Sequence, residues 1–98
     1  MEVRFIRSGQ QFRWDSEKAR SNFVKHGVRF EQAGEVFFDP FIHIVDATVE
    51  DEAREAALGL AEDWTLLFVV HVVRARGIIR IVSTRPATSA ERRIYEDG

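Results

Sequence analysis

The sequence predicts an α+β fold, with a small antiparallel sheet, two helices early in the chain and one helix at the C-terminus. Two β-branched runs, Trp64–Arg74 and Ile78–Arg85, are separated by a turn that ends at Gly77, as in a hairpin. Capped, periodically apolar segments lie before and after these runs. Neither a repeat nor a linker divides the 98 residues, so we expect one domain, 1–98, in which residues 1–11 form an N-terminal extension without an assigned role.

The first third of the chain is predicted to hold two short strands and a helix. Val3–Ile6 and Gln11–Trp14 alternate as strands do. Asp15, or the next residue, is a suitable N-cap for a helix over Ser16–His26, and Gly27 can take the left-handed conformation that ends it. The residues of this helix that we expect to face the core are Ala19, Phe23 and His26.

A second short helix is predicted over Phe30–Phe38, stopped by Asp39-Pro40 and followed by a strand at Phe41–Val45. Its expected inner stripe is Phe30, Ala33 and Phe37. The segment Asp51–Leu60 is ambiguous, because its alanines favour a helix while its leucines and Ala56 alternate as in a strand.

The run Trp64–Arg74 is apolar at both alternations, which predicts a central strand covered on both faces. We therefore expect its tryptophan to be buried, like Trp14 and the phenylalanines. In the partner run Ile78–Arg85, regular alternation puts Arg80 and Thr84 on one face. Ile79, Ile81 and Ser83 then lie on the other face.

The last helix is predicted over Ser89–Glu96. Thr88 and Glu91 have the spacing of a capping box, in which each side chain binds a backbone N–H group of the other's turn. The same helix places Arg92 and Tyr95 three residues apart, near one another on its surface.

Charge is unevenly distributed along a chain whose net charge is only −2. Residues 1–30 carry seven basic and three acidic side chains, residues 31–63 carry one and ten, and residues 64–98 carry six and three. If the two basic ends meet in space, they form a surface suited to phosphate, with an acidic region elsewhere. Without cysteines, a secretion signal or an apolar run long enough to span a bilayer, the chain is expected in the cytoplasm and not at a membrane.

Two blocks of residues resemble the BrnT family of toxins, in order and spacing, from about residue 12 to the end. The first block is Trp14-Asp15, Lys18, Asn22, Lys25-His26-Gly27-Val28, Phe30 and Ala33. The second is Val69-Val70-His71, Arg80 to Arg85, Ala87-Thr88, Glu91-Arg92-Arg93 and Tyr95. Arg29 departs from the pattern because it is a poor helix cap, and Thr84 and Pro86 remove a possible phosphate contact beside Arg85.

This resemblance implies a RelE-like fold and an endoribonuclease toxin that inhibits translation. It also implies a BrnA-like ribbon-helix-helix antitoxin as partner, so that the chain reaches operator DNA only through that antitoxin. By the same resemblance the ambiguous segment becomes a strand, at about Arg54 to Leu60.

RNA can be cut without a metal when its own 2′-hydroxyl attacks the adjacent phosphate, which requires a base, an acid and a cation. Arginine suits the cation, because its planar fork binds two phosphate oxygens. We expect Arg80 or Arg85 to fill this role with help from Arg92, although a regular strand would point the first two to opposite faces. The bland alternative is that these arginines are solvated or paired with carboxylates.

His71 is a candidate general base or acid by its position in the family pattern, but a histidine among apolar residues is more often a hydrogen-bonded core residue. Tyr95 is a candidate for base stacking or proton donation, or simply packs its helix down. The residues expected to contact RNA are Lys18, Lys25, His26 and Arg93. Lys25 and His26 also complement the dipole of the helix that they end.

The three histidines are far apart in sequence and the acidic cluster Glu50-Asp51-Glu52 is contiguous, so we predict neither a metal site nor a cofactor. Arg20 and His26 match the loose spacing of all-helical HEPN ribonucleases, but the predicted hairpin contradicts an all-α fold. The remaining alternative is a module derived from such a toxin that binds protein or nucleic acid without cutting it.

Overall fold

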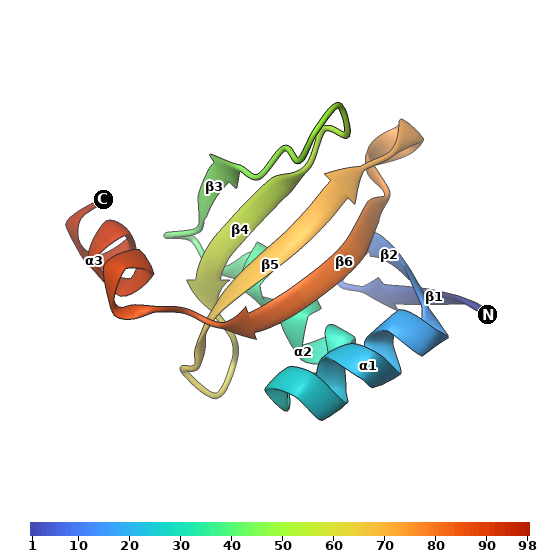
Figure 1. Ribbon diagram of the computed structural model, residues 1–98, viewed down its shortest axis with the longest axis horizontal. Helices are drawn as coiled ribbons and strands as arrows, with labels where there is room; N and C mark the ends of the chain where they lie inside the picture. Colours follow the sequence, from blue (N-terminus) through green and yellow to red (C-terminus); the bar gives the residue numbers. More distant parts are fainter.

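The computed structural model describes residues 1–98, and its six strands form one sheet with three helices around it (Figure 1). In chain order the elements are β1 (Glu2–Arg7), β2 (Gln10–Asp15), α1 (Ser16–His26), α2 (Phe30–Glu35), the 3₁₀ helix η1 (Val36–Phe38), β3 (His43–Asp46), β4 (Glu55–Leu60), β5 (Leu66–Val73), the 3₁₀ turn η2 (Ala75–Gly77), β6 (Ile79–Pro86) and α3 (Ser89–Asp97). The strand order is β1-β2-β6-β5-β4-β3, and all neighbours are antiparallel except β2 and β6. The predicted α+β class is confirmed.

The N-terminal residues belong to the sheet. β1 and β2 form a hairpin whose two turn residues, Ser8 and Gly9, both have positive φ, as tight hairpins require. Both predicted strands are therefore present. The segment 1–11, which the sequence left without a role, supplies the outermost strand and the start of the next.

Helix α1 has the predicted bounds and caps. The Asp15 carboxylate accepts a hydrogen bond from the backbone N–H of Lys18, and Gly27 ends the helix with φ 70°. The predicted inner stripe is wrong in part: Phe23 is 41% exposed under the guanidinium of Arg29, His26 lines a surface groove, and Asn22 is the buried residue. Helix α2 and η1 fill the predicted span 30–38, and Arg29 provides no side-chain cap, as expected.

The core lies between the sheet and the two early helices. Its buried members are Phe12, Trp14, Val28, Phe30, Ala33, Val36, Ala57, Ala61, Leu67, Val69, Ile79 and Ile81. The ambiguous segment is β4, so its alternation outweighs its helix propensity. In Figure 1, α2 lies behind the sheet, and α1 lies along β6.

The other sheet face, called the open face here, is not covered by α1 and α2. The prediction that β5 is covered on both faces is wrong for most of the strand. Leu67 and Val69 are fully buried, and Leu66 at the start of the open face is buried too, but Phe68, Val70 and Val72 on the open face are only partly buried. The expected burial of Trp64 is also wrong. It lies in the turn before β5 and is 80% exposed.

A β-bulge at Val82 changes the predicted faces of β6. Val70 pairs with Ser83 and His71 with Ile81, so Val82 has no partner on β5. Beyond the bulge Ser83 and Arg85 lie on the open face and Thr84 points into the core, the reverse of regular alternation. The bulge thus places Arg80 and Arg85 on the same face, although they are five positions apart and regular alternation would put them on opposite faces.

Helix α3 begins with the predicted capping box and lies at the β3–β4 end of the sheet (Figure 1). The Thr88 hydroxyl accepts from the backbone N–H of Glu91 at 3.2 Å, and the Glu91 carboxylate accepts from that of Thr88 at 2.9 Å. No residue of α3 is buried, so polar contacts contribute much of what holds it in place.

Candidate functional site

Arginines from neighbouring strands lie side by side on the open face. Arg4 pairs with Arg13 across β1 and β2, and Arg13 pairs with Arg80 across β2 and β6. Their strand neighbours Phe12 and Ile79 point into the core, so the arginine side chains leave the opposite face. Arg74, from the β5–β6 connection, joins Arg13 and Arg80 in lining a cleft of about 350 Å³. We call these four residues the arginine cluster.

One carboxylate lies within this cluster. The guanidinium of Arg80 donates from Nη1 to Oε1 of Glu2 at 2.8 Å. This hydrogen bond, together with the charges of Arg80, Arg13 and Arg4, lowers the pKa of Glu2. Like charges placed directly opposite repel one another, and a single carboxylate does not neutralise four guanidinium groups. The arginine cluster therefore keeps an excess of positive charge, as an anion-binding surface requires.

A second basic site, the lysine groove, lies between α1 and the bulge of β6. Lys18, Lys25 and His26 line this groove of about 340 Å³ together with Ser83 and one carboxylate, that of Glu17. The two lysines are seven residues apart on α1 and so share one helix face, next to the part of β6 that β2 does not pair. Neither lysine forms an ion pair. Ser83 lies between Arg80 and Arg85 on the same strand, and all three residues lie on the open face.

The guanidinium of Arg85 is engaged at both of its terminal nitrogens. It donates from Nη1 and Nη2 to the two carboxylate oxygens of Glu91 at 2.8 and 2.9 Å and lies 4.3 Å from the ring centroid of Phe68. The hydrogen bonds to Glu91 raise the pKa of Arg85, and they lower that of Glu91. A phosphate that binds here in bidentate fashion has to displace the Glu91 carboxylate.

His71 lies on the other side of the sheet from the arginines. It is 1% exposed, its Nδ1 is 3.1 Å from the carbonyl oxygen of Val69, and its Nε2 is 3.4 Å from a carboxylate oxygen of Glu55. Its ring packs edge-on against that of Phe37, with 4.9 Å between the two ring centroids. His71, a candidate general base or acid, therefore faces away from Arg80 and Arg85 in this structure.

The C-terminal helix carries its predicted residues away from Arg80. The Tyr95 hydroxyl donates to Oδ2 of Asp39 at 2.5 Å, and its ring lies 5.8 Å from that of His43. Burial, together with this contact, raises the pKa of Tyr95 to about 12. Arg92 and Arg93 are exposed on the same helix and form no ion pair.

The sequence comparison decides the family. A family model described as the ribonuclease toxin BrnT of type II toxin–antitoxin systems matches residues 14–91. The chain belongs to this family. The crystal structure of the BrnT ribonuclease toxin of Brucella abortus is similar, with a TM-score of 0.61 over 78% of this chain and 94% of that chain, at 19% identity, which shows the same fold. A comparison with curated protein sequences gives no significant match.

Membership of the BrnT family makes RNA the substrate class and implies a protein antitoxin as partner. No helix of this chain is long and apolar enough to cross a membrane. No three histidine, aspartate or glutamate side chains come together in a way that could hold a metal ion.

Three members of the arginine cluster, Arg4, Arg13 and Arg74, were missed by the sequence reasoning. The alternation of Val3, Phe5, Phe12 and Trp14 with polar residues already places Arg4 and Arg13 on the outward face of a hairpin. What the sequence does not contain is the parallel pairing of β2 with β6, which brings this BrnT-family hairpin beside Arg80.

Proposed function

We propose that this BrnT-family chain is an endoribonuclease that cleaves RNA without a metal ion, through attack of the 2′-hydroxyl on the adjacent phosphate, and that it thereby inhibits translation. The arginine cluster is the observation that supports this proposal most strongly. It gathers cations on one accessible surface, as stabilisation of a pentacoordinate phosphate requires. The lysine groove, also basic, offers a path for the flanking phosphates.

Arg80 is the phosphate-binding residue in this proposal. Only its Nη1 is engaged, by Glu2, so Nη2 and Nε remain to bind phosphate oxygens. Arg13 stabilises the same charge from the neighbouring strand. Arg85 contributes once the incoming phosphate takes the place of Glu91.

His26 is the histidine best placed for proton transfer to or from RNA. It shares an accessible groove with Lys18 and Lys25, whereas His71 is buried and His43 packs against Tyr95. We therefore assign His71 to the core rather than to catalysis. Tyr95 holds α3 in place, and Arg92 and Arg93 are exposed on that helix, outside both basic sites.

The partner in this proposal is a BrnA-like ribbon-helix-helix antitoxin, and operator DNA is reached only through it. Family membership supports an antitoxin as the partner. The site of action is the cytoplasm, where messenger RNA and the antitoxin are present together.

Cleavage of a defined RNA by the purified, antitoxin-free chain tests the proposal. In EDTA, wild type should leave products ending in a 2′,3′-cyclic phosphate. Arg80→Ala and Arg13→Ala should lower the rate by on the order of a hundredfold. Arg20→Ala is the matched control, because that arginine is exposed on α1 outside both the arginine cluster and the groove. It should cleave like wild type.

Two results would contradict the nuclease proposal. Cleavage that disappears in EDTA and returns with a divalent ion rejects the metal-independent mechanism. RNA that binds with a steep salt dependence but stays intact identifies a non-catalytic binding module, a reading that the pairing of Arg80 and Arg85 with carboxylates also fits.

A further inference from the structure

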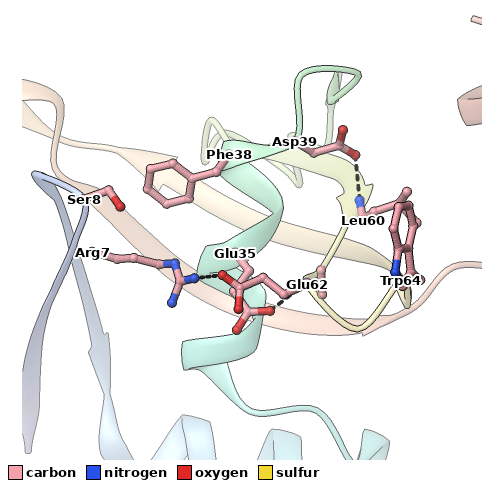
Figure 2. Close-up of a pocket in the computed structure, with 9 residues that line it drawn as sticks. Arg7, Ser8, Glu35, Phe38, Asp39, Leu60, Glu62 and Trp64 are labelled. Carbon is pink, nitrogen blue, oxygen red and sulfur yellow. Dashed lines mark hydrogen bonds and ion pairs between the residues drawn. The ribbon is translucent and has the colours of Figure 1, made fainter.

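A third cleft, of about 420 Å³, is drawn in Figure 2. It shares no residue with either basic site. It is enclosed by the end of β1, by the segment from Glu35 to Asp39, and by the turn between β4 and β5. In Figure 2, Arg7 reaches into it from one side and Trp64 borders it on the other. We call the surface formed by Glu35, Phe38, Glu62 and Trp64 the aromatic–acidic patch.

Trp64 is held in an exposed position that the fold does not explain. It has φ 68°, a left-handed conformation that favours glycine or asparagine, and 80% of it is exposed. The turn is closed by backbone hydrogen bonds from Trp64 to Ala61 and from Ala61 to Thr65, and by the Asp63 carboxylate accepting from the N–H of Thr65. None of these bonds uses the indole. A strained, exposed aromatic residue is a reason to look for a function.

A second aromatic residue lies on the same cleft. Phe38 is 43% exposed at the end of η1, and Figure 2 shows its ring between Arg7 and Asp39. Tryptophan is one of the residues that supply most of the binding energy in protein interfaces, and phenylalanine is also enriched there. Phe38 and Trp64 are available for such contacts.

The charge around the cleft is negative. Glu35, Asp39 and Glu62 line it, and the one cation, Arg7, forms an ion pair with Glu62 (Figure 2). The Glu62 backbone N–H donates to Oε1 of Glu35 at 2.9 Å, which fixes that carboxylate in the cleft. Burial, opposed by Arg7, raises the pKa of Glu35, so its charge would be stabilised by a cation brought by a ligand.

We infer that the aromatic–acidic patch docks the antitoxin, through a segment of that protein that places a lysine or arginine beside an apolar side chain. The inference rests on the proposed function for the existence of this partner. RNA and anionic membrane surfaces are repelled by the carboxylates, whereas a basic, partly apolar polypeptide matches both the charge and the exposed rings.

Calorimetric titration with the small protein encoded beside this chain tests the inference. Trp64→Gly removes the indole and suits the left-handed backbone, so a loss of binding does not reflect unfolding. This variant should bind at least about 30-fold more weakly than wild type. Glu35→Gln keeps a hydrogen-bond acceptor for Glu62 and removes the charge, so it should weaken binding less and reduce its dependence on salt. Val24→Ala, at an 81% exposed apolar residue on α1, is the matched control and should bind like wild type.

The remaining outcomes separate this inference from the proposed function. Equal affinity of wild type and Trp64→Gly, or an equal loss in Val24→Ala, overturns the patch and leaves the partnership intact. If wild type does not bind this protein, both the docking surface and the proposed antitoxin partner are rejected. The proposed nuclease activity is then tested separately, by the RNA cleavage assay. Light scattering can also show that the chain alone forms a dimer. If Trp64→Gly abolishes that dimer, the patch binds a second copy of this chain, and the inference is overturned. In every case Trp64→Gly without antitoxin should cleave RNA like wild type.

Discussion

The side-chain amide of Asn22 in α1 binds both backbone groups of Thr84 in β6. Its Nδ2 donates to the Thr84 carbonyl at 2.9 Å, and its Oδ1 accepts from the Thr84 N–H at 3.0 Å. Because β2 pairs with β6 only at Ile79 and Arg80, this amide takes the place of a neighbouring strand just beyond the bulge. Asn22 thereby joins the helix of the lysine groove to the strand that carries Arg80 and Arg85.

Replacing this amide should destabilise the whole chain. Asn22→Ala leaves a buried N–H and a buried carbonyl of Thr84 unpaired, so the free energy of unfolding should fall by about 3 kcal/mol in denaturant titration. Ser21→Ala, at the exposed neighbouring residue, is the control and should change it by less than about 0.5 kcal/mol. If Asn22→Ala lowers the free energy of unfolding by no more than this control does, water or α1 itself forms the hydrogen bonds to Thr84.

The pair formed by Arg85 and Glu91 should give the chain an acid-sensitive component of stability. The Arg85 hydrogen bonds lower the pKa of Glu91 in the folded state, so the unfolded chain takes up this proton more readily. The stabilisation is present above the ordinary glutamate pKa and is lost as pH falls through the lowered value. Glu91→Gln should therefore cost about 1 kcal/mol at neutral pH and nothing in strong acid, measured by urea unfolding across pH.

This substitution is selective because glutamine also serves in a capping box. Its N-terminal cap on α3 is kept while the ion pair is lost. Glu96→Gln, an exposed residue of the same helix, provides the control and should leave the pH profile unchanged. A constant difference between Glu91→Gln and wild type at all pH values would assign the effect to packing instead of charge.

His71→Gln tests whether that histidine belongs to the core. Because the ring is buried against Phe37 and faces away from Arg80, the substitution should lower the free energy of unfolding by about 2 kcal/mol. RNA cleavage per folded molecule should match wild type when both are assayed well below their unfolding temperatures. His26→Gln, in the lysine groove, should show the opposite behaviour, with stability kept and cleavage lost.

The sequence predicted the fold well where a local signal determines the structure. Asp15 and Gly27 set the bounds of α1, and Thr88 with Glu91 sets the start of α3. It failed at β6, because a bulge is decided by the pairing of two strands and here also by Asn22, far away in sequence. Trp64 was misjudged because one apolar run can begin either inside the strand or in the turn before it.

The basic sites show the same difference between what local sequence signals predict and what long-range contacts decide. Lys18, Lys25 and His26 were predicted together and line one groove, since helical spacing alone brings them to one face. Arg80 was predicted, but its neighbours Arg4 and Arg13 depend on a parallel pairing between segments more than 60 residues apart. Arg92 was expected to assist Arg80 or Arg85, but its helix α3 is tied to Asp39 by Tyr95, a contact without any local signal.

The contact between Tyr95 and Asp39 should be visible in a direct titration. Tyr95 is the one tyrosine of the chain, so the ultraviolet absorbance of tyrosinate reports on it alone. Burial and the adjacent carboxylate raise its pKa from 10.0 to about 12, so in the folded protein the absorbance should change near pH 12. A group whose folded pKa is raised stabilises the fold fully below its unfolded pKa. That contribution should therefore be lost as pH rises from about 10 to about 12.

Asp39→Asn separates the two causes of this shift. It removes the negative charge, so the tyrosine should titrate at a lower pH than in wild type but still above its unperturbed value, because burial remains. Circular dichroism recorded on the same samples has to show that the sheet persists, since tyrosine in an unfolded chain titrates normally. Titration of folded wild type near pH 10 would contradict the contact, and with it the account of how α3, without a buried residue, is held against the sheet.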